Sequence, residues 1–342
     1  MSESDRSNRI KVFYSAKQSL PSDADQTSPS PSKPRMIVET IASSHFAEHF
    51  QLTDDFPPLD KGDFLLAHDE KYVDDFMTGR MPDAAASGLV WSEALVNAVG
   101  LTTSSLYHAI RHSVQDPRTI CFSPTSGFHH AQPLRGLMYC PISGQVIASL
   151  KVYEQFGLSG AYLDLDAHFG NSIEDSRTFC PNLNAAVPPG MNINPKYKHG
   201  EYLQQFSLNL DTLEARILND EIHYVVFCHG ADSHQDDDLG GQCTTGEWLE
   251  CSVMFYNWVK RIDAKLGRPL PISVSLFGGY RADNFDFVIN LHLADLVICL
   301  NALCGTNIDY TVQDNARKSD SYNVKDVDRN SRSYGTDFVW PD

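Results

Sequence analysis

The feature that most constrains this chain is a set of short apolar runs in which polar and apolar residues hardly alternate. Segments with helical patterns, such as 144–157 and 246–265, separate these runs. Strands that are apolar on both faces and alternate with helices are typical of a parallel sheet covered on both sides. We therefore predict an α/β fold with a central, mostly parallel sheet, whose main strands are 119–123, 160–165, 224–228 and 272–277.

Further elements are predicted around these strands. RIKVFYS (9–15) is rich in β-branched and aromatic residues and is predicted as a first strand. Proline and serine interrupt the segment 19–35, which is expected to be a surface loop. Helices are predicted at 36–50, 69–79, 92–112 and 285–304, of which the last is apolar enough to be buried.

The chain is expected to form a single domain over residues 1–304. Its 342 residues, 42% of them hydrophobic, are enough for the core of one large α/β domain. From residue 305 onward the sequence is polar and rich in Asp, Asn, Ser and Arg. Residues 305–342 are therefore predicted to be a loosely held extension, in which FVW (338–340) could dock on the domain.

Charge and cysteine usage limit the partners and the compartment. A formal net charge of −17 argues against direct nucleic-acid binding and against anionic lipid. No apolar run reaches the roughly 20 residues of a membrane span, and the N-terminal sequence lacks the apolar core of a signal peptide. The eight cysteines are scattered without CxxC pairs, which favours reduced thiols in a cytoplasmic protein. The sequence makes no prediction of oligomeric state.

Polar residues follow each of the four main strands. The following segments are PTSGFHHA (124–131), AHFGN (167–171), HGADSH (229–234) and GGY (278–280). The carboxyl ends of parallel strands lie at one edge of the sheet, which is where open α/β sheets bind their ligands. We expect the side chains of these four segments to converge.

The segment after the second main strand indicates a metal site. Asp164, Asp166 and His168 alternate along the chain and can share one face. Buried carboxylates are costly unless a positive charge compensates them, and a divalent cation would do so. With Asp232 from the next strand, two carboxylates and one imidazole leave a coordination position open for water, as in catalytic zinc sites.

The other two segments supply groups for amide hydrolysis. An open metal position acidifies its water and polarises a carbonyl. Hydrolysis also needs a base and a donor to the developing oxyanion. The pair His129–His130 can offer the base, and Tyr280, which follows two glycines, can offer the hydroxyl.

Taken in order, PTSGFHHA, DLDAHFGN, GADSHQDDDLGG and GGY resemble the zinc-dependent deacetylase family over roughly residues 9–304. This family comprises histone deacetylases, their bacterial relatives and the acetylpolyamine amidohydrolases. The resemblance implies the arginase/deacetylase-type three-layer fold and one Zn²⁺ per chain. It also implies hydrolysis of the amide of an acylated primary amine, such as acetyl-lysine in a protein or peptide, or an acetylpolyamine.

The resemblance assigns roles residue by residue. Asp166, His168 and Asp232 match the zinc ligands, and Tyr280 matches the tyrosine that polarises the acyl oxygen. The histidines match the tandem pair of the family. His130 would be the general base and then the proton donor to the leaving amine.

His129 would act mainly as an electrostatic and hydrogen-bonding partner. Asp164 matches the carboxylate that supports His129 and that also sits at a monovalent-cation site, which implies K⁺ as a structural ion. Asn171 occupies the position where the family has Asp or Asn behind the other histidine. Asparagine there resembles the class II branch and should leave His130 less basic.

The substrate channel follows the family less closely. Tyr139 matches an aromatic wall of the acyl-lysine channel, and Leu239 matches another lining position. Met138 stands where the family has glycine before the channel aromatic, and Phe169 replaces a second histidine. The stretch 178–200 offers no match to the second channel aromatic, so the shape of the channel and the substrate are not predicted in detail.

Three other interpretations remain open. HFAEH (45–49) fits the H-x-x-E-H pattern of inverted zinc peptidases if it is helical, although an exposed helix face is favoured. A binuclear, arginase-like ureohydrolase would need carboxylates where this chain has Gly170 and His234. The same fold could also serve as a non-catalytic module that binds acylated ligands or partner proteins. The acidic run 236–238 is expected at the rim of the site, without a direct catalytic role.

Overall fold

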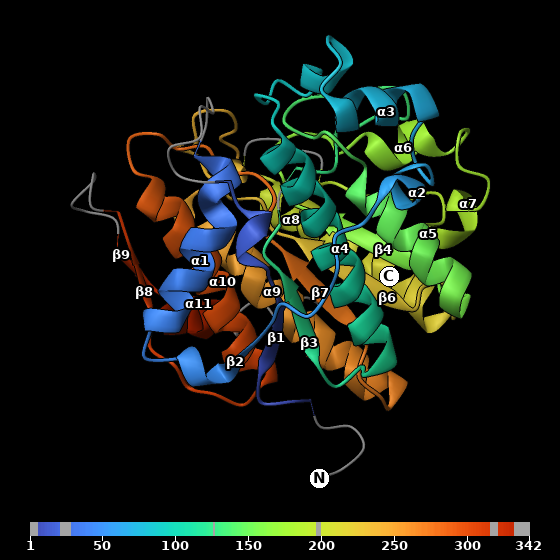
Figure 1. The fold of residues 1–342 in the computed structure, drawn as a ribbon. Helices are drawn as coiled ribbons and strands as arrows, with labels where there is room; N and C mark the ends of the chain where they lie inside the picture. Colours follow the sequence, from blue (N-terminus) through green and yellow to red (C-terminus); the bar gives the residue numbers. More distant parts are fainter. Residues whose placement is uncertain (1–5, 21–28, 126, 196–199, 315–320, 332–342) are drawn as a thin grey trace.

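The computed structural model describes residues 6–20, 29–125, 127–195, 200–314 and 321–331. Its centre is a sheet of seven strands, all paired in parallel, in the order β2-β1-β3-β7-β6-β4-β5 (Figure 1). The predicted α/β fold is therefore confirmed. The strands are β1 Ile10–Phe13, β2 Phe50–Thr53, β3 Ile120–Ser123, β4 Gly160–Asp164, β5 Asn192–Ile193, β6 Tyr224–Cys228 and β7 Ile272–Ser275.

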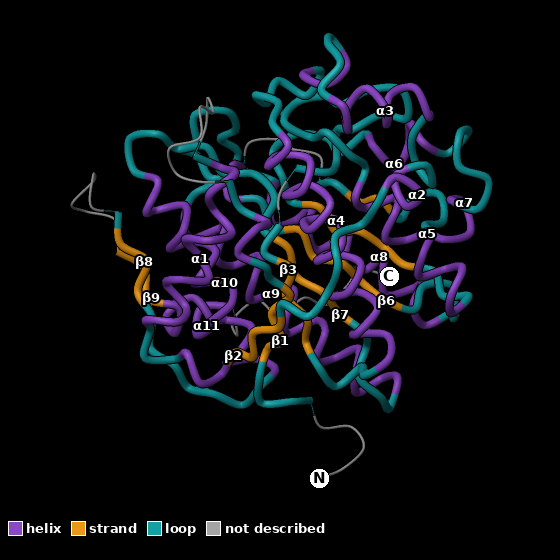
Figure 2. The backbone as a smooth tube through the Cα atoms, viewed as in Figure 1, coloured by secondary structure: helices purple, strands orange, loops and turns teal. Residues whose placement is uncertain are grey.

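Helices lie around this sheet (Figure 2). One group consists of α4, which packs on β1, β3 and β7, and its neighbour α5; a second group has α9 in contact with α8, α10 and α11. The helices are α1 Lys33–Ser43, α2 Lys61–Phe64, α3 Glu70–Thr78, α4 Glu93–Gln115, α5 Gly144–Phe156, α6 Ser172–Ser176, α7 Leu183–Ala186, α8 Tyr202–Leu218, α9 Thr245–Leu266, α10 Phe285–Leu303 and α11 Val324–Ser331.

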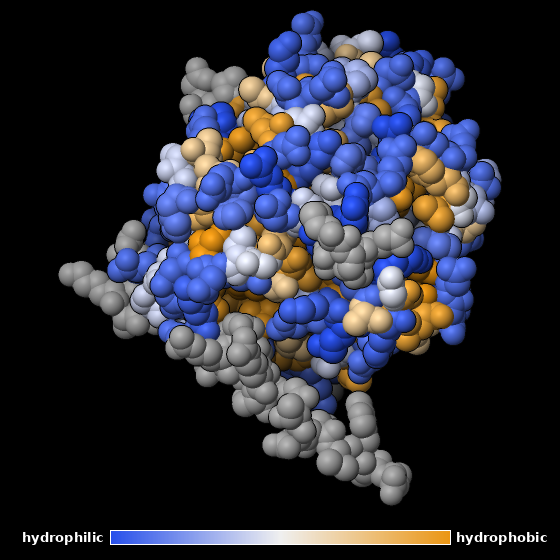
Figure 3. All heavy atoms as spheres, turned by 90° about the horizontal axis from the view of Figure 1, so that it is seen from below, coloured by the Kyte–Doolittle hydropathy of each residue, from blue (hydrophilic) through white to orange (hydrophobic). Residues whose placement is uncertain are grey.

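The four central strands are completely buried. Every residue of β3, β4, β6 and β7 is buried, which explains why their sequences are continuous rather than alternating. The edge strands β2 and β5 were not predicted, because β2 is half exposed and β5 has only two residues. The helix α8 was not predicted either. The molecular surface seen in Figure 3 is largely hydrophilic, with hydrophobic side chains gathered in smaller areas.

The apolar helix α10 is a core helix. By length and composition it is the one helix among the described residues that could cross a membrane, but 72% of its most apolar window is buried inside the protein. It packs against α9 and α1. Its hydrophobic sequence is thus explained by burial in the core, as predicted for 285–304.

The helix predicted at 36–50 ends early, at Ser43. The hydroxyl of Ser44 donates to the carbonyl of Ile41 and that of Ser43 to the carbonyl of Glu39, and the backbone turns extended at Ser44. Serine hydroxyls compete in this way with the helical backbone pattern. His45 and His49 therefore do not lie one turn apart on a helix, and the helical H-x-x-E-H interpretation is wrong.

All eight cysteines are free, and seven of them are buried.

The interpretation of 19–35 as a surface loop is only partly correct. Residues 21–28 lie outside the described residues, whereas Leu20 and Lys33 are buried and α1 begins at Lys33. The side chain of Lys33 has a partner inside the protein, which the sequence does not reveal.

Part of the C-terminal extension packs on the domain rather than being loosely held. Strands β8 (Thr311–Gln313) and β9 (Ser321–Asn323) form an antiparallel pair, and α11 lies against α9. Val312 and Val324 are almost fully buried and belong to the hydrophobic core. The predicted docking of FVW falls outside the described residues.

Candidate active site

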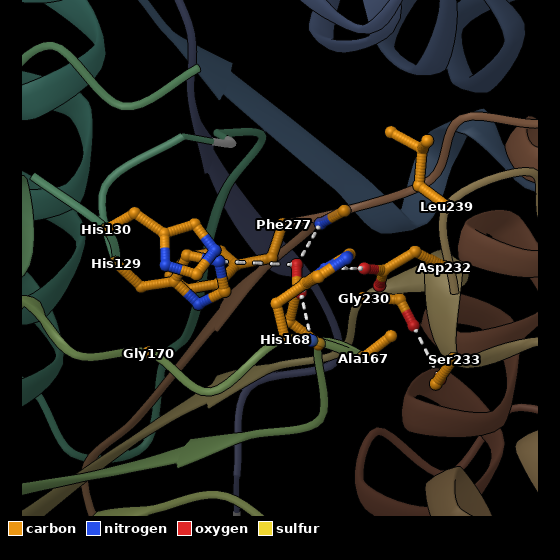
Figure 4. A network of polar contacts seen from close by, with 12 residues as sticks. His129, His130, Ala167, His168, Gly170, Gly230, Asp232, Ser233, Leu239 and Phe277 are labelled. Carbon is orange, nitrogen blue, oxygen red and sulfur yellow. Dashed lines mark hydrogen bonds and ion pairs between the residues drawn. The ribbon is translucent and has the colours of Figure 1, made fainter. Parts of the chain in front are cut away.

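The loops that follow β3, β4, β6 and β7 meet at one edge of the sheet (Figure 4). These four strands are neighbours in the sheet, which is why segments distant in the sequence converge. His129 and His130 follow β3 and lie side by side, and His168 follows β4 and points toward Asp232. Asp232 lies in a short 3₁₀ helix, Ala231–Ser233, after β6.

Asp166, His168 and Asp232 form a cluster that can hold a metal ion. One ligand atom from each lies within 4.8 Å of the others. The Nδ1 atom of His168 is 3.0 Å from Oδ1 of Asp166 and 3.0 Å from Oδ2 of Asp232. Oδ1 of Asp232 is buried without a hydrogen-bond partner among the described residues. An unpartnered carboxylate oxygen in such a cluster fits a divalent cation.

Gly278 allows the two carboxylates to approach the loop after β7. A Cβ atom at this position would lie 2.4 Å from Cγ of Asp232 and 2.6 Å from Oδ2 of Asp166. The backbone N–H of Gly278 instead donates to Oδ2 of Asp166 over 2.9 Å. The first glycine of GGY is therefore required by close contact with the cluster.

The carboxylates and the imidazole of this cluster compete for protons. Burial, and then the charge of Asp166, raise the pKa of Asp232 well above its usual value. Burial also acts on Asp166, but the charge of His129 and hydrogen bonds from His168 lower its pKa. Hydrogen bonds to Asp166 and Asp232 raise the pKa of His168 to about 10. A bound divalent cation would displace the protons that the cluster otherwise holds.

The tandem histidines have opposite electrostatic environments. Nδ1 of His129 is 2.8 Å from Oδ2 of Asp164; although burial disfavours its charge, Asp166 and Asp164 raise its pKa to about 9. Nδ1 of His130 is 2.9 Å from Oδ1 of Asn171. Burial, and then the charge of His129, lower the pKa of His130 to about 4. The predicted division into base and electrostatic partner requires a neutral His130 beside a charged His129, and this division stays a prediction.

Gly170 leaves room for the pair formed by His129 and Asp164. A Cβ atom at residue 170 would lie 2.8 Å from Oδ2 of Asp164 and 3.0 Å from Nδ1 of His129. A carboxylate side chain cannot occupy this position without disturbing the pair.

His234 is the second position at which a binuclear site would need a carboxylate. Both of its ring nitrogens are engaged, one by Oγ1 of Thr245 and the other by the backbone N–H of Asp236. These contacts disfavour the binuclear interpretation.

Replacing Asn171 with aspartate is expected to shift the acidic limb of the pH profile of kcat/KM to higher pH. A carboxylate beside Nδ1 would stabilise the charged imidazole and raise the pKa of His130 from about 4. Because a general base must be neutral, less of it would be active at a given mildly acidic pH. The measurement is a pH profile of both proteins. The control is Asn184→Asp, an exposed change on α7, which should leave the acidic limb of the profile in place. If the acidic limb does not move in Asn171→Asp, His130 is not the base.

Tyr280 lies beside Tyr139, and their ring centroids are 6.1 Å apart. Burial, and then the charges of Asp166 and Asp232, raise the pKa of Tyr280 well above its usual value, so its hydroxyl stays protonated and can donate. Both tyrosines line a pocket whose other walls are mostly apolar: Leu20, Pro31, Pro34, Leu89, Leu95, Ala98, Val99, Phe128 and Pro141.

The other predicted channel residues are exposed around the site. Leu239 and Met138 are about half exposed, and Leu239 points away from His168 in Figure 4. Met138 and Tyr139 have φ values of 43° and 62°, in the left-handed region that favours glycine. Met138, which stands where the family has glycine, thus adopts a backbone conformation that glycine favours. Phe169, next to His168, is 59% exposed.

Lys33 is a site residue that sequence reasoning missed. Its Nζ atom donates to the carbonyl oxygens of Phe277 and Gly278, which are three and two residues before Tyr280. Burial lowers the pKa of Lys33 to about 8, although Asp232 and Asp166 act in the opposite direction. No periodic pattern marks this lysine, because it lies in a polar segment and its partners are far along the chain.

Three side-chain amides hold the loop after β4, and the sequence did not indicate them. Each donates to a backbone carbonyl of that loop: Asn194 to Asp164, Gln242 to Ala167 and Asn192 to Gly170. The carbonyl oxygen of Asp164 thus already accepts a hydrogen bond. A structural K⁺ near Asp164 remains a prediction that these contacts do not support.

Comparisons with known proteins concern the N-terminal half of the chain and the fold. The family model of the histone deacetylase domain matches residues 28–186, which include both tandem histidines, Asp166 and His168. Among solved structures, the crystal structure of the HDA15 HD domain matches with a TM-score of 0.64 and 15% sequence identity, covering 87% of this chain and 89% of that chain. At this identity the likeness concerns the fold. No curated protein matches the sequence significantly.

Proposed function

Since the domain match and the shared fold support a histone deacetylase-family protein, we propose that this chain hydrolyses the amide of an acylated primary amine with one bound Zn²⁺. The observation that carries the proposal is the cluster of Asp166, His168 and Asp232 beside two histidines whose pKa values shift in opposite directions. An amidohydrolase needs this combination of an open metal site and a neutral base.

Asp166, His168 and Asp232 would hold the metal. When bound, the ion would acidify a water and polarise the acyl carbonyl. His130 would take a proton from that water on Nε2, because its Nδ1 is 2.9 Å from the amide oxygen of Asn171 and carries the proton there. The same nitrogen would then give the proton to the leaving amine.

His129 and Tyr280 would stabilise charge around the reacting carbonyl. His129, held charged by Asp164 and Asp166, would favour the negative charge that develops during attack. The hydroxyl of Tyr280, protonated in its buried position, would donate to the developing oxyanion. Lys33 would keep the backbone before Tyr280 in place through its two hydrogen bonds.

The substrate class follows from charge and chemistry. A net charge of −17 favours a cationic amine, such as an acyl-lysine peptide or an acylated polyamine. The pocket beside Tyr139 and Tyr280 is mostly apolar, so acyl groups of several lengths belong in the test panel. We propose the cytoplasm as the location, in keeping with eight free cysteines.

Metal analysis and a substrate panel test this proposal. Protein purified without chelators should contain one zinc per chain and release free amine from acyl-lysine peptides or acylated polyamines. Chelator treatment should abolish turnover and zinc should restore it, which controls for damage during treatment. Two metals per chain with ureohydrolase activity would favour the binuclear alternative. A metal-free protein that stays silent after zinc is added would favour a binding module.

A further inference from the structure

Arg281, the residue after Tyr280, makes a buried ion pair with the C-terminal extension. Its Nη1 atom lies 2.6 Å from Oδ2 of Asp314, and each of the two side chains is only 2% exposed. Nη2 approaches the other oxygen of Asp314 at 3.4 Å. The amide of Asn284 also donates to Asp314, over 2.9 Å. One carboxylate from outside the main sheet thus contacts both ends of the turn that follows Tyr280.

The acidic run expected at the rim holds the other side of the same turn. The backbone N–H of Tyr280 donates to Oδ2 of Asp237 over 2.7 Å, and that of Ala282 donates to Oδ2 of Asp238 over 2.8 Å. Carboxylates therefore bind residues 280, 281 and 282 in turn. Arg281 has two of them, because its Nε also donates to the exposed Asp283 over 2.8 Å. The position of the Tyr280 side chain depends on this turn, because the two glycines before it supply no side-chain contacts of their own.

The physical cost of the ion pair indicates a positional role. Taking two charges out of water costs nearly as much as their attraction returns, so a buried pair contributes little net stability. Such a pair nevertheless favours one geometry over others, because displacing Asp314 leaves the buried guanidinium with the exposed Asp283 as its remaining carboxylate partner among the described residues. The Cζ atom of Arg281 also lies 5.0 Å from the ring centroid of Phe287, on the first turn of α10, which is a cation–π contact.

We propose that Asp314 is a positioning residue, which through Arg281 fixes the turn that carries Tyr280 and so makes the C-terminal extension part of the active site. The effect of Asp314 on turnover rests on the proposed function, whereas its effect on the turn does not. Residues 305–314 are then needed for the reaction although none of them belongs to the metal cluster.

A double-mutant cycle tests this assignment. Asp314→Asn keeps the shape of the side chain and removes its charge. We expect kcat to fall by about 10- to 100-fold, the effect of misplacing a reacting group, with KM and zinc content little changed. In a Tyr280→Phe background the same change should have little further effect, because the hydroxyl that it positions is gone. An equal loss in both backgrounds would overturn the proposal. Asp314→Glu should recover part of the activity.

Hydrogen exchange of the turn provides a readout that needs no activity. Backbone amides of residues 280–284 should exchange faster in Asp314→Asn than in the unchanged protein. Asp309→Asn, an exposed change in the same extension, should leave them unaffected. Unchanged exchange in Asp314→Asn would overturn the proposal, whatever the activity. Faster exchange in a protein without any amidohydrolase activity would keep the positioning role and reject the proposed function. If Asp314→Asn does not fold, Arg281→Lys carries the same two measurements.

Discussion

Replacing Asp166 with alanine is expected to remove metal binding and amide hydrolysis together. Oδ1 of Asp166 accepts from the backbone N–H of His168 at 2.9 Å and lies 3.0 Å from its ring, while Oδ2 accepts from Gly278. The change would therefore remove one ligand and also the contacts that orient a second one. The loss of metal affinity should exceed the roughly 10- to 100-fold that removal of an outer-sphere partner costs.

The measurement is metal content after gel filtration, alongside kcat/KM on the best substrate of the panel. Asp211→Ala, an exposed aspartate on α8, is the matched control and should retain both metal and turnover. Full zinc content in Asp166→Ala would show that Asp166 is not a ligand. Undiminished turnover would contradict the location of the active site at this edge of the sheet.

The position of the site could be predicted because its signals are local. The alternation of Asp164, Asp166 and His168 is visible in the sequence, and the apolar strand before them identifies the edge of the sheet. The four loops converge because β3, β7, β6 and β4 are neighbours, and a parallel sheet requires their ends to meet on one side. The fold class and the shared edge of these loops thus follow from the strand sequences, whereas the order of the strands comes from the structure.

The supports of the site could not be predicted, because they are single residues that act over long distances. Lys33 and its acceptor Gly278 are 245 positions apart, and Arg281 and Asp314 are 33 positions apart, on opposite sides of α10 in the sequence. A charged residue in a polar stretch is usually exposed. The composition of these segments therefore predicted exposed side chains, whereas the structure buries them. Only the packing of α1 and of the extension against the domain reveals these partners.

The predicted helix over 36–50 extended too far, and its early end also removes the zinc-peptidase interpretation of HFAEH, which was not the favoured one. HFAEH satisfies a zinc-peptidase pattern only if its residues are helical. Two serine hydroxyls end α1 before the motif begins, and the histidines lose the spacing that the chemistry requires. A motif is therefore a prediction about the backbone as much as about side chains.

Replacing Tyr280 with phenylalanine is expected to lower kcat by about 10²- to 10³-fold, the usual effect of losing one oxyanion donor. The change removes only the hydroxyl, so the ring should keep its place beside Tyr139. Zinc content should stay full, because Tyr280 is not among the three residues of the metal cluster. KM should change little if the hydroxyl acts mainly on the charge that develops in the transition state.

Steady-state kinetics and metal analysis of the same preparation distinguish this role from a structural one. Tyr107→Phe removes a hydroxyl that contacts Gln155 on the surface and should leave kcat unchanged. Unchanged kcat in Tyr280→Phe would remove the assigned role, and the water and His130 alone would then have to account for turnover. A loss of zinc together with activity would mean that the tyrosine supports the metal cluster. A large fall in kcat at full zinc content, with KM preserved, is the one outcome that a donor to the oxyanion produces and a structural tyrosine does not.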